Sequence, residues 1–299
     1  MNLLTTYMEA NMSKMIKALG LNEEVKIYIS ETTSVVNEAI KKHDLWPSAA
    51  SVLGKAMTIG LLMGGTLKQD QALTIKIDGN GPIGQVVVDA NGHGEVRGYV
   101  TNPHITFSKS GKIDEITTLG CNGYIDVIKD LHMNDLFTSS TEIITGDLAK
   151  DFTYYLMNSE QVPSAILLGS KFDVDNSCTV CGGMMIQPLP NASEETISYL
   201  EKVLNDNIEF SSLLLNNDLE GIIKLFFKDN YRILEEEDCK FTCPCSHDRF
   251  KQSLIRLGKK EIKEMLDENK DIEVVCHYCN SAYIFTVKEL QEIYDLLTK

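Results

Sequence analysis

Four cysteines in the last quarter of the sequence constrain how this chain can fold more than any other feature. Cys243 and Cys245 form a C-x-C pair around Pro244, and Cys276 and Cys279 form a C-x-x-C pair. A zinc ion held by four thiolates needs its ligands in two close pairs, because two short loops each bend around one side of a coordination sphere with a radius of about 2.3 Å. The spacing therefore predicts one tetrahedral Zn²⁺ site per chain, with these four cysteines as its metal ligands.

Three neighbouring residues are weaker candidates for metal ligands. Cys239 lies in a polar run just before the C-x-C pair, and His247 and His277 flank the two pairs. We rank all three below the four cysteines, because an isolated surface histidine is usually only solvated and Cys239 sits between charged neighbours. A different ligand geometry could use one of them in place of one of the four cysteines.

A disulfide framework, or a set of small buried apolar residues, is the alternative interpretation of the cysteines. A secretory signal would favour disulfides, but Glu9 and Lys14 interrupt the start of the chain before an apolar segment can form. The sequence therefore indicates a cytoplasmic protein in a reducing compartment, where thiols persist and metal binding is the commoner use of such pairs.

Composition restricts the partners of the chain. Its 299 residues, 43% of them hydrophobic and 24% charged, can bury a sizeable core in two domains. The formal charge of -15 argues against nucleic-acid binding, which needs a basic surface to displace counterions. Residues 236–299 alone carry ten Lys/Arg and thirteen Asp/Glu. No apolar run reaches membrane-spanning length. We therefore expect neither nucleic acid nor membrane as a partner.

Periodicity in the first 190 residues predicts an α+β core with an antiparallel sheet. Strand-like alternation is found at residues 25–30, 73–77, 83–89, 95–101, 124–128, 142–145, 165–174 and 178–187. Gly-Asn and Asn-Gly turns between the second, third and fourth of these segments predict an antiparallel meander. Helices are expected from Thr32 or Thr33 to residue 43, over residues 48–63, which are apolar or small nearly all round, and over residues 147–158.

The remainder of the chain divides into a helical linker and a small C-terminal domain. Residues 191–234 contain amphipathic segments, the first opened by Ser193, whose composition suggests helices docked on another surface. Residues 235–299 are expected to form a zinc-binding α+β domain. Ser246 should cap a helix that Gly258 ends, a second helix should follow, and a hairpin around the C-x-x-C pair should precede a final helix opened by Thr286 and Glu289.

Cys178 and Cys181 form a further C-x-x-C within the last predicted strand of the core. A spacing of three on a continuous strand directs two side chains to opposite faces, so we interpret them as small core residues and not as metal ligands. Gly182 and Gly183 leave room for a turn, so a redox-active or metal-binding pair stays as an alternative.

The metal site suggests a switch. A domain of about sixty residues is marginal on its own core, whereas structural zinc contributes about 10–16 kcal/mol to folding. Oxidants convert thiolates into sulfenic acids and disulfides, which no longer supply four sulfur ligands. Oxidation should therefore unfold the domain and release the apolar helices that precede it.

Several stretches of the sequence resemble the redox-regulated thirty-three-kilodalton heat-shock chaperones, a family of ATP-independent holdases, over nearly the whole chain. The matching stretches are HDLWP at residues 43–47, GNGPIG at 79–84, GEVRGYVTNP at 94–103, DFTYY at 151–155, SEQVPS at 159–164, and the C-terminal Cys-x-Cys-Ser and Cys-His-x-Cys-Asn elements. So many ordered matches make coincidence an inadequate explanation.

The resemblance implies a specific cycle. In the reduced protein, Cys243, Cys245, Cys276 and Cys279 would bind zinc and the chaperone would be inactive. Peroxide with unfolding, or hypochlorous acid, would form Cys243–Cys245 and Cys276–Cys279 disulfides, release zinc, unfold the C-terminal domain and loosen the linker. The exposed apolar surface would then hold unfolding client proteins, and the oxidised chain would form a homodimer.

Two features depart from the family pattern, and two other functions are alternatives. The family usually has small residues other than cysteine at positions 178 and 181, and Cys239 is outside its motif, so extra disulfides are open. A zinc-ribbon nucleic-acid-binding protein is disfavoured by the acidic charge. A thiol-disulfide oxidoreductase would need a thioredoxin-like βαβ context that the sequence lacks. No constellation for catalysis stands out, and we predict no enzyme activity.

Overall fold

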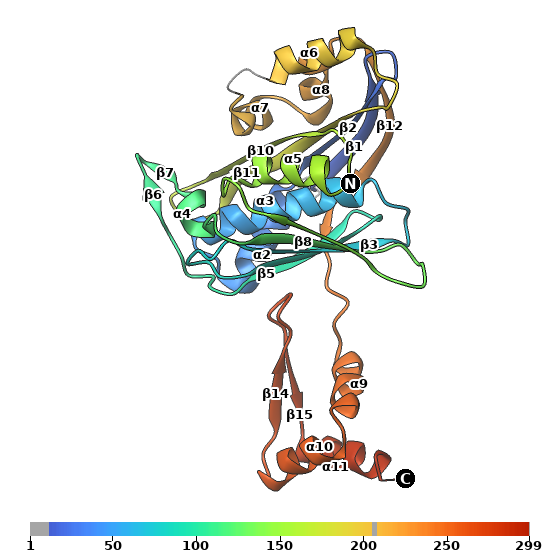
Figure 1. Cartoon of the computed structure of the whole chain (residues 1–299). Helices are drawn as coiled ribbons and strands as arrows, with labels where there is room; N and C mark the ends of the chain where they lie inside the picture. The colour runs from blue at the N-terminus through green and yellow to red at the C-terminus, as the bar shows by residue number, and fades with distance from the viewer. Residues whose placement is uncertain (1–11, 205–207, 299) are drawn as a thin grey trace, which may run out of the picture. The chain divides into compact units, whose positions relative to one another are not determined.

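The computed structural model describes residues 12–204 and 208–298. The chain forms two compact units, an N-terminal unit, Met1–Thr242, and a C-terminal unit, Cys243–Lys299 (Figure 1). Sheets and helices occur in both, so the predicted α+β class is confirmed. None of the helices within the described residues is both long enough and apolar enough to span a membrane.

The first sheet of the N-terminal unit has five strands in the order β10-β11-β2-β1-β12, and all of its neighbouring strands are antiparallel. Its strands are β1 (Lys14–Gly20), β2 (Val25–Glu31), β10 (Ala165–Phe172), β11 (Cys178–Pro188) and β12 (Tyr231–Asp238). The strands predicted at residues 25–30, 165–174 and 178–187 are therefore confirmed as β2, β10 and β11.

The second sheet has six strands in the order β13-β5-β4-β3-β8-β9. Its strands are β3 (Ala72–Asp78), β4 (Val86–Asn91), β5 (Glu95–Val100), β8 (Tyr124–Asp130), β9 (Phe137–Glu142) and β13 (Lys240–Phe241). β3, β4 and β5 are antiparallel neighbours, as predicted for the meander. A small hairpin of β6 (Ser108–Lys109) and β7 (Lys112–Ile113) extends beyond this sheet.

One apolar helix fills the space between the two sheets. α3 (Pro47–Gly64) is buried along almost its whole length, which explains why its sequence is apolar or small on every side (Figure 1). Around it pack α2 (Thr33–His43), the short α4 (Glu115–Leu119) and α5 (Leu148–Asn158). The three helices predicted for the core are confirmed as α2, α3 and α5.

Three further helices cover the face of the first sheet that points away from α3 (Figure 1). They are α6 (Glu194–Leu204), α7 (Phe210–Asn216) and α8 (Leu219–Phe227). Ser193 accepts a hydrogen bond from the Thr196 N–H, so it opens α6 as predicted. The apolar face of α8, including Ile222 and Phe227, packs on strands β1 and β2. Packing on a sheet thus stabilises helices that are too short to be stable alone.

Two strand boundaries differ from the prediction. The strand predicted at residues 142–145 is wrong, because β9 ends at Glu142 and the chain then wraps around the carboxylate of Asp151, which accepts hydrogen bonds from the N–H groups of Ile144, Thr145 and Gly146. The strand predicted from residue 83 begins at Val86, because residues 81–84 form a hydrogen-bonded turn.

β1 and β12 were not predicted as strands. Lys17 of β1 forms ion pairs with Glu235 and Glu237 of β12, so charges that suggest a polar linker instead join two strands. The sequence places the start of the last domain at residue 235. In the structure, residues 235–238 continue β12, and the compact C-terminal unit begins at Cys243.

The C-terminal unit contains three helices and one hairpin. They are α9 (His247–Leu257), α10 (Lys259–Asp267), the antiparallel strands β14 (Ile272–Val275) and β15 (Ala282–Phe285), and α11 (Val287–Leu296). Ser246 caps α9, Gly258 follows its last residue with φ 98°, and Thr286 and Glu289 form a capping box on α11. The helix ends, the hairpin and the capping box predicted for this part of the chain are therefore confirmed.

Candidate metal centre

The first pair of cysteines lies in the extended segment that leads into α9. Cys243 and Cys245 flank Pro244, whose carbonyl oxygen accepts a hydrogen bond of 2.9 Å from the guanidinium of Arg249. Ser246 then accepts a hydrogen bond from the Arg249 N–H at the helix start. Proline and the cap hold the loop bent, so that both sulfur atoms face the same side.

The second pair lies in the turn between β14 and β15. The Cys276 N–H donates to the Ser281 carbonyl over 2.9 Å, and the Asn280 N–H donates to the Cys276 carbonyl over 2.7 Å. Asn280 has φ 57°, a left-handed conformation that asparagine adopts more readily than most residues. The turn therefore directs the sulfur atoms of Cys276 and Cys279 to one side, and both residues are buried.

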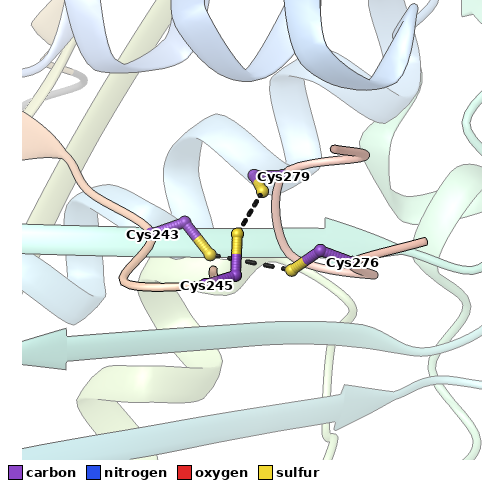
Figure 2. A group of neighbouring side chains, drawn as sticks. All are labelled: Cys243, Cys245, Cys276 and Cys279. Carbon is purple, nitrogen blue, oxygen red and sulfur yellow. Dashed lines mark hydrogen bonds between the residues drawn. The ribbon is translucent and has the colours of Figure 1, made fainter. Parts of the chain in front are cut away.

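Figure 2 shows the four thiols of the two loops pointing toward one another. The sulfur atoms of Cys243 and Cys276 are 3.7 Å apart, those of Cys245 and Cys279 are 3.2 Å apart, and all four lie within 4.8 Å of one another. A zinc ion with sulfur at about 2.3 Å requires sulfur–sulfur edges of about 3.8 Å. The donor set, four soft sulfurs without a carboxylate, also suits zinc, so these residues fit the ion.

The protein environment alone does not ionise all four thiols at neutral pH. Burial raises the pKa of the Cys276 thiol to about 12 and also raises that of Cys245. Burial disfavours the Cys279 thiolate as well, but hydrogen bonds with Ser281 outweigh it and lower the pKa of Cys279 to about 7. A divalent cation at the centre of the four sulfurs would supply the positive charge that four thiolates need.

Two aromatic residues support the centre. The hydroxyl of Tyr283 on β15 lies 3.2 Å from the sulfur of Cys245. The ring of His247 stacks on Phe285 at 4.1 Å between centroids, and its Nε2 lies 3.4 Å from a carboxylate oxygen of Glu289. His247 therefore packs on Phe285 and makes a polar contact with Glu289. The role of Tyr283 was not predicted, since alternation along a short strand does not show which side chain reaches a sulfur.

The other candidate ligands do not join the group of four cysteines. The group that the structure brings together contains neither His247 nor His277. Cys239 lies in the core of the N-terminal unit, where its N–H donates to the Ser13 carbonyl over 2.7 Å. Burial raises the pKa of the Cys239 thiol to about 12. In the part of the chain that the structure describes, the first-ranked ligand set is the one that converges.

Cys178 and Cys181 are both buried in the core, as their interpretation as small core residues predicts. The expectation that they point to opposite faces is wrong. The pairing of β10 with β11 shifts register between Lys171 and Phe172, and this bulge adds one residue to β11 between the two cysteines. Their side chains therefore share one face.

Comparisons with known proteins agree with this architecture. The family model described as Hsp33 protein matches residues 13–286. The 33 kDa chaperonins of Bacillus velezensis and Bacillus subtilis are 45% and 42% identical to this chain over 292 residues, which cover 96% of this chain and 100% of each relative. The crystal structure of a 33 kDa chaperonin, a heat shock protein 33 homologue from Thermotoga maritima, is similar with a TM-score of 0.88 and 30% identity, covering 95% of this chain and 98% of that one.

The family match spans the part of the chain that contains both pairs of cysteines, and the relatives align over nearly their whole lengths. The chain belongs to the Hsp33 family of chaperones.

Proposed function

We propose that this chaperone is an ATP-independent holdase whose activity is controlled by oxidation of Cys243, Cys245, Cys276 and Cys279. In the reduced, inactive state these residues hold one Zn²⁺. The observation that carries the proposal is the position of the thiols: they join the two loops of a unit whose own apolar core is small. Five buried hydrophobic residues, with partly buried ones packed against them, form that core in the described part, namely Leu254, Ile262, Phe285, Leu290 and Ile293.

The energies favour a metal-dependent fold. A structural zinc site contributes about 10–16 kcal/mol of apparent folding free energy, whereas a whole domain is stable by only about 5–15 kcal/mol. A unit of this size with five buried core residues gains little from its apolar interior. Loss of the ligands should therefore unfold residues 243–299.

Oxidation removes the ligands in pairs. Two thiols and one molecule of peroxide give one disulfide and two molecules of water. We propose the pairs Cys243–Cys245 and Cys276–Cys279, each within one loop. Sulfur–sulfur distances of 3.7 Å and 3.2 Å join Cys243 to Cys276 and Cys245 to Cys279, as expected for two loops that face each other across one ion. Peptide mapping of the oxidised chain distinguishes the two pairings.

The released surface lies under α6, α7 and α8. These helices cover an apolar face of the first sheet that includes Ile27, Ile29 and Met184, and α8 contributes Ile222 and Phe227 to the same cluster. β12 joins this helical segment to residue 242. We propose that unfolding of the C-terminal unit loosens the linker, so that this face becomes available to client proteins.

In functional terms we propose a core domain of residues 1–190, a releasable linker of residues 191–234 and a redox-switch domain of residues 235–299. The partners are unfolded or partly unfolded proteins, and the oxidised chain forms a homodimer. The protein acts in the cytoplasm, binds neither nucleic acid nor membrane, and catalyses no reaction. Membership of a chaperone family and the acidic charge of -15 support these assignments.

The decisive experiment measures zinc release and client protection in one sample. The reduced, zinc-loaded chain is treated with hydrogen peroxide at mildly elevated temperature. A chromogenic chelator follows the zinc, and light scattering follows aggregation of a chemically unfolded client. We expect zinc release and suppression of aggregation to rise together, and a thiol reductant with added zinc to reverse both.

A matched cysteine variant controls for non-specific oxidation. Cys121 is exposed and outside the group of four, so Cys121→Ser should respond to peroxide as the unaltered chain does. Equal client protection by the reduced, zinc-loaded chain and the oxidised chain would contradict the proposal, as would zinc release without any gain in protection.

A further inference from the structure

A second pair of cysteines lies on one face of β11. Cys178 is opposite Phe172 of β10 and Cys181 is opposite Ser170. Their partners are two residues apart on β10 although the cysteines are three apart on β11, because Thr179 is the extra residue of the bulge. The cysteines therefore occupy neighbouring positions on the face that packs on the central helix of the unit.

The bulge brings the pair within the range of a disulfide. Two residues of strand span about 6.6 Å, which is near the upper end of the separation between Cα atoms in disulfides, about 4.4–6.8 Å. The two thiols are close enough for each to shift the pKa of the other, and the sulfur of Cys181 lies 3.7 Å from the hydroxyl oxygen of Thr58. An unbulged strand would hold these side chains on opposite faces.

Small oxidants have a route to this pair. Cys178 lines a groove with a volume of about 990 Å³, together with residues such as Asn37 of α2 and Leu214 of α7. Cys178 is 4% exposed and Cys181 is 0% exposed, so the groove reaches the first thiol only. Cys178 also begins its strand, directly after a turn whose Val174 is 99% exposed, and this position lets its backbone adjust when a bond forms.

We propose that Cys178 and Cys181 form a second oxidisable thiol pair, which closes an intramolecular disulfide inside the N-terminal unit independently of the metal centre. The disulfide concerns thiols that lie outside the group of four, so it does not require the proposed switch. Only its order relative to zinc release rests on the zinc site proposed above. It gives the chain a site of modification that can be oxidised while zinc stays bound.

The chemistry requires a two-electron oxidant such as hydrogen peroxide. Peroxide oxidises the Cys178 thiol at the groove to a sulfenic acid and is itself reduced to water. The Cys181 sulfur then attacks the sulfur of Cys178, the S–O bond breaks, and a second water leaves with the proton of the Cys181 thiol. In the reduced pair, the interaction with Cys178, together with the Thr32 and Thr58 hydroxyls and Lys55, lowers the pKa of Cys181, whereas the interaction with Cys181 and burial raise the pKa of Cys178. Access through the groove, and not thiolate character, therefore selects Cys178 for the first step.

The Cys178–Cys181 disulfide should also change the contact between β11 and α2. The side-chain amide of Asn37 donates to the Cys178 carbonyl over 2.9 Å and accepts from the Cys178 N–H over 2.9 Å. Formation of the disulfide would move Cys178 toward Cys181 and weaken both of these hydrogen bonds. Faster hydrogen exchange at the Cys178 amide is therefore an expected readout of the disulfide.

The test uses the full-length, zinc-loaded chain and hydrogen peroxide. After oxidation the chain is unfolded in an alkylating reagent, digested and mapped by mass spectrometry. We expect one peptide in which Cys178 and Cys181 have both escaped alkylation and are joined to each other, with alkylation restored by a thiol reductant. Samples that still retain all their zinc should already contain this peptide.

Two single variants separate the roles of the thiols. In Cys181→Ser, Cys178 should stop at the sulfenic acid and react with a cyclic 1,3-dione probe. In Cys178→Ser, Cys181 should stay reduced under the same treatment. Cys121→Ser serves as the control and should give the same Cys178–Cys181 peptide as the unaltered chain, and thermal unfolding of each variant establishes that it is folded.

Three outcomes would overturn the proposal. The first is full alkylation of both cysteines after peroxide has oxidised the metal centre. The second is a stable sulfenic acid at Cys178 in the unaltered chain with Cys181 reduced. The third is a disulfide that joins Cys178 or Cys181 to any other cysteine.

Discussion

Tyr283, on β15, contacts one of the four sulfur atoms directly. Its hydroxyl lies 3.2 Å from the Cys245 sulfur, and the hydrogen bond with Cys245 raises the pKa of Tyr283 to about 12. The phenol therefore keeps its proton at neutral pH and donates it toward the sulfur. Donation to a thiolate withdraws electron density, so it should slow attack of that sulfur on peroxide and hold the ligand in place.

Removing this donor should make the centre more labile. In Tyr283→Phe we expect the affinity for zinc to fall by about tenfold to a hundredfold, the usual effect of losing a partner of a ligand, and zinc release in peroxide to become faster. Competition with a chromogenic chelator measures the affinity, and the same chelator follows the release. Tyr294→Phe is the control, since Tyr294 packs in the same unit over Lys259. Unchanged affinity and release in Tyr283→Phe would assign Tyr283 to packing alone.

At the residue scale, short-range signals could be predicted and long-range ones could not. Paired spacing predicted the four cysteines that converge, and the Thr286–Glu289 capping box follows from residues three apart. The shared face of Cys178 and Cys181 depends on a bulge that only pairing with β10 reveals. The contact of Tyr283 likewise joins a strand to a loop 38 residues earlier in the sequence.

The linker begins with a helix that is tied to the first hairpin of the fold. The carboxylate of Glu24 accepts hydrogen bonds from the Thr196 hydroxyl and from the N–H and hydroxyl of Ser193, just before and in the first turn of α6. These bonds, the Thr196 hydroxyl first, lower the pKa of Glu24 below its usual 4.5. A carboxylate with a lowered pKa in the folded state stabilises that state above its unfolded pKa and loses this effect as the pH falls through the folded pKa.

Neutralising Glu24 should loosen α6. In Glu24→Gln we expect faster amide hydrogen exchange in residues 194–204 at neutral pH, because the amide side chain is a weaker acceptor than the carboxylate. As the pH falls below the folded pKa of Glu24, the difference between the variant and the unaltered chain should vanish. Hydrogen exchange measured by mass spectrometry across this pH range is the test. A difference that persists with the carboxyl protonated would show that shape, and not charge, holds the helix.

Packing of α8 should control how readily the linker is released. Ile222 is 0% exposed against the sheet, and a buried isoleucine changed to alanine costs about 2–5 kcal/mol. In Ile222→Ala we expect the reduced, zinc-loaded chain to suppress client aggregation that the unaltered reduced chain does not. Leu225 on the same helix is 59% exposed, so Leu225→Ala is the matched control and should leave the reduced chain inactive. If both reduced variants suppress client aggregation to the same extent, docking of α8 does not control activation of the chaperone.

At the scale of helices and strands, apolar periodicity predicted the elements that bury a regular apolar face. It located α2, α3 and α5, and most strands of the two sheets, because each buries a regular apolar pattern. It missed β1 and β12, where Lys14 and Lys17 pair with Glu235, Glu236 and Glu237 across the strands. Charges that compensate one another between distant segments look like a solvated linker when each segment is considered alone.

The two compact units differ in what stabilises them. The N-terminal unit buries α3 between two sheets and contains two large apolar clusters, so its fold has ample support from packing. The C-terminal unit has the five-residue core and the four converging thiols. We therefore expect removal of the proposed metal ion to affect the C-terminal unit alone, and removal under reducing conditions separates the effect of the ion from that of thiol oxidation.

Chelation of zinc in the presence of a phosphine reductant should unfold one unit and spare the other. We expect amide protection to be lost in α9, α10 and α11 and retained in α3, because the ion contributes more folding free energy than the small core can replace. Hydrogen exchange measured by mass spectrometry gives the result unit by unit. Zinc added back should restore protection, whereas magnesium should not, since four thiolates suit the softer ion. If the reduced, metal-free chain keeps residues 243–299 protected, the core of that unit suffices on its own, and oxidation must act through the disulfides themselves instead of through loss of the metal.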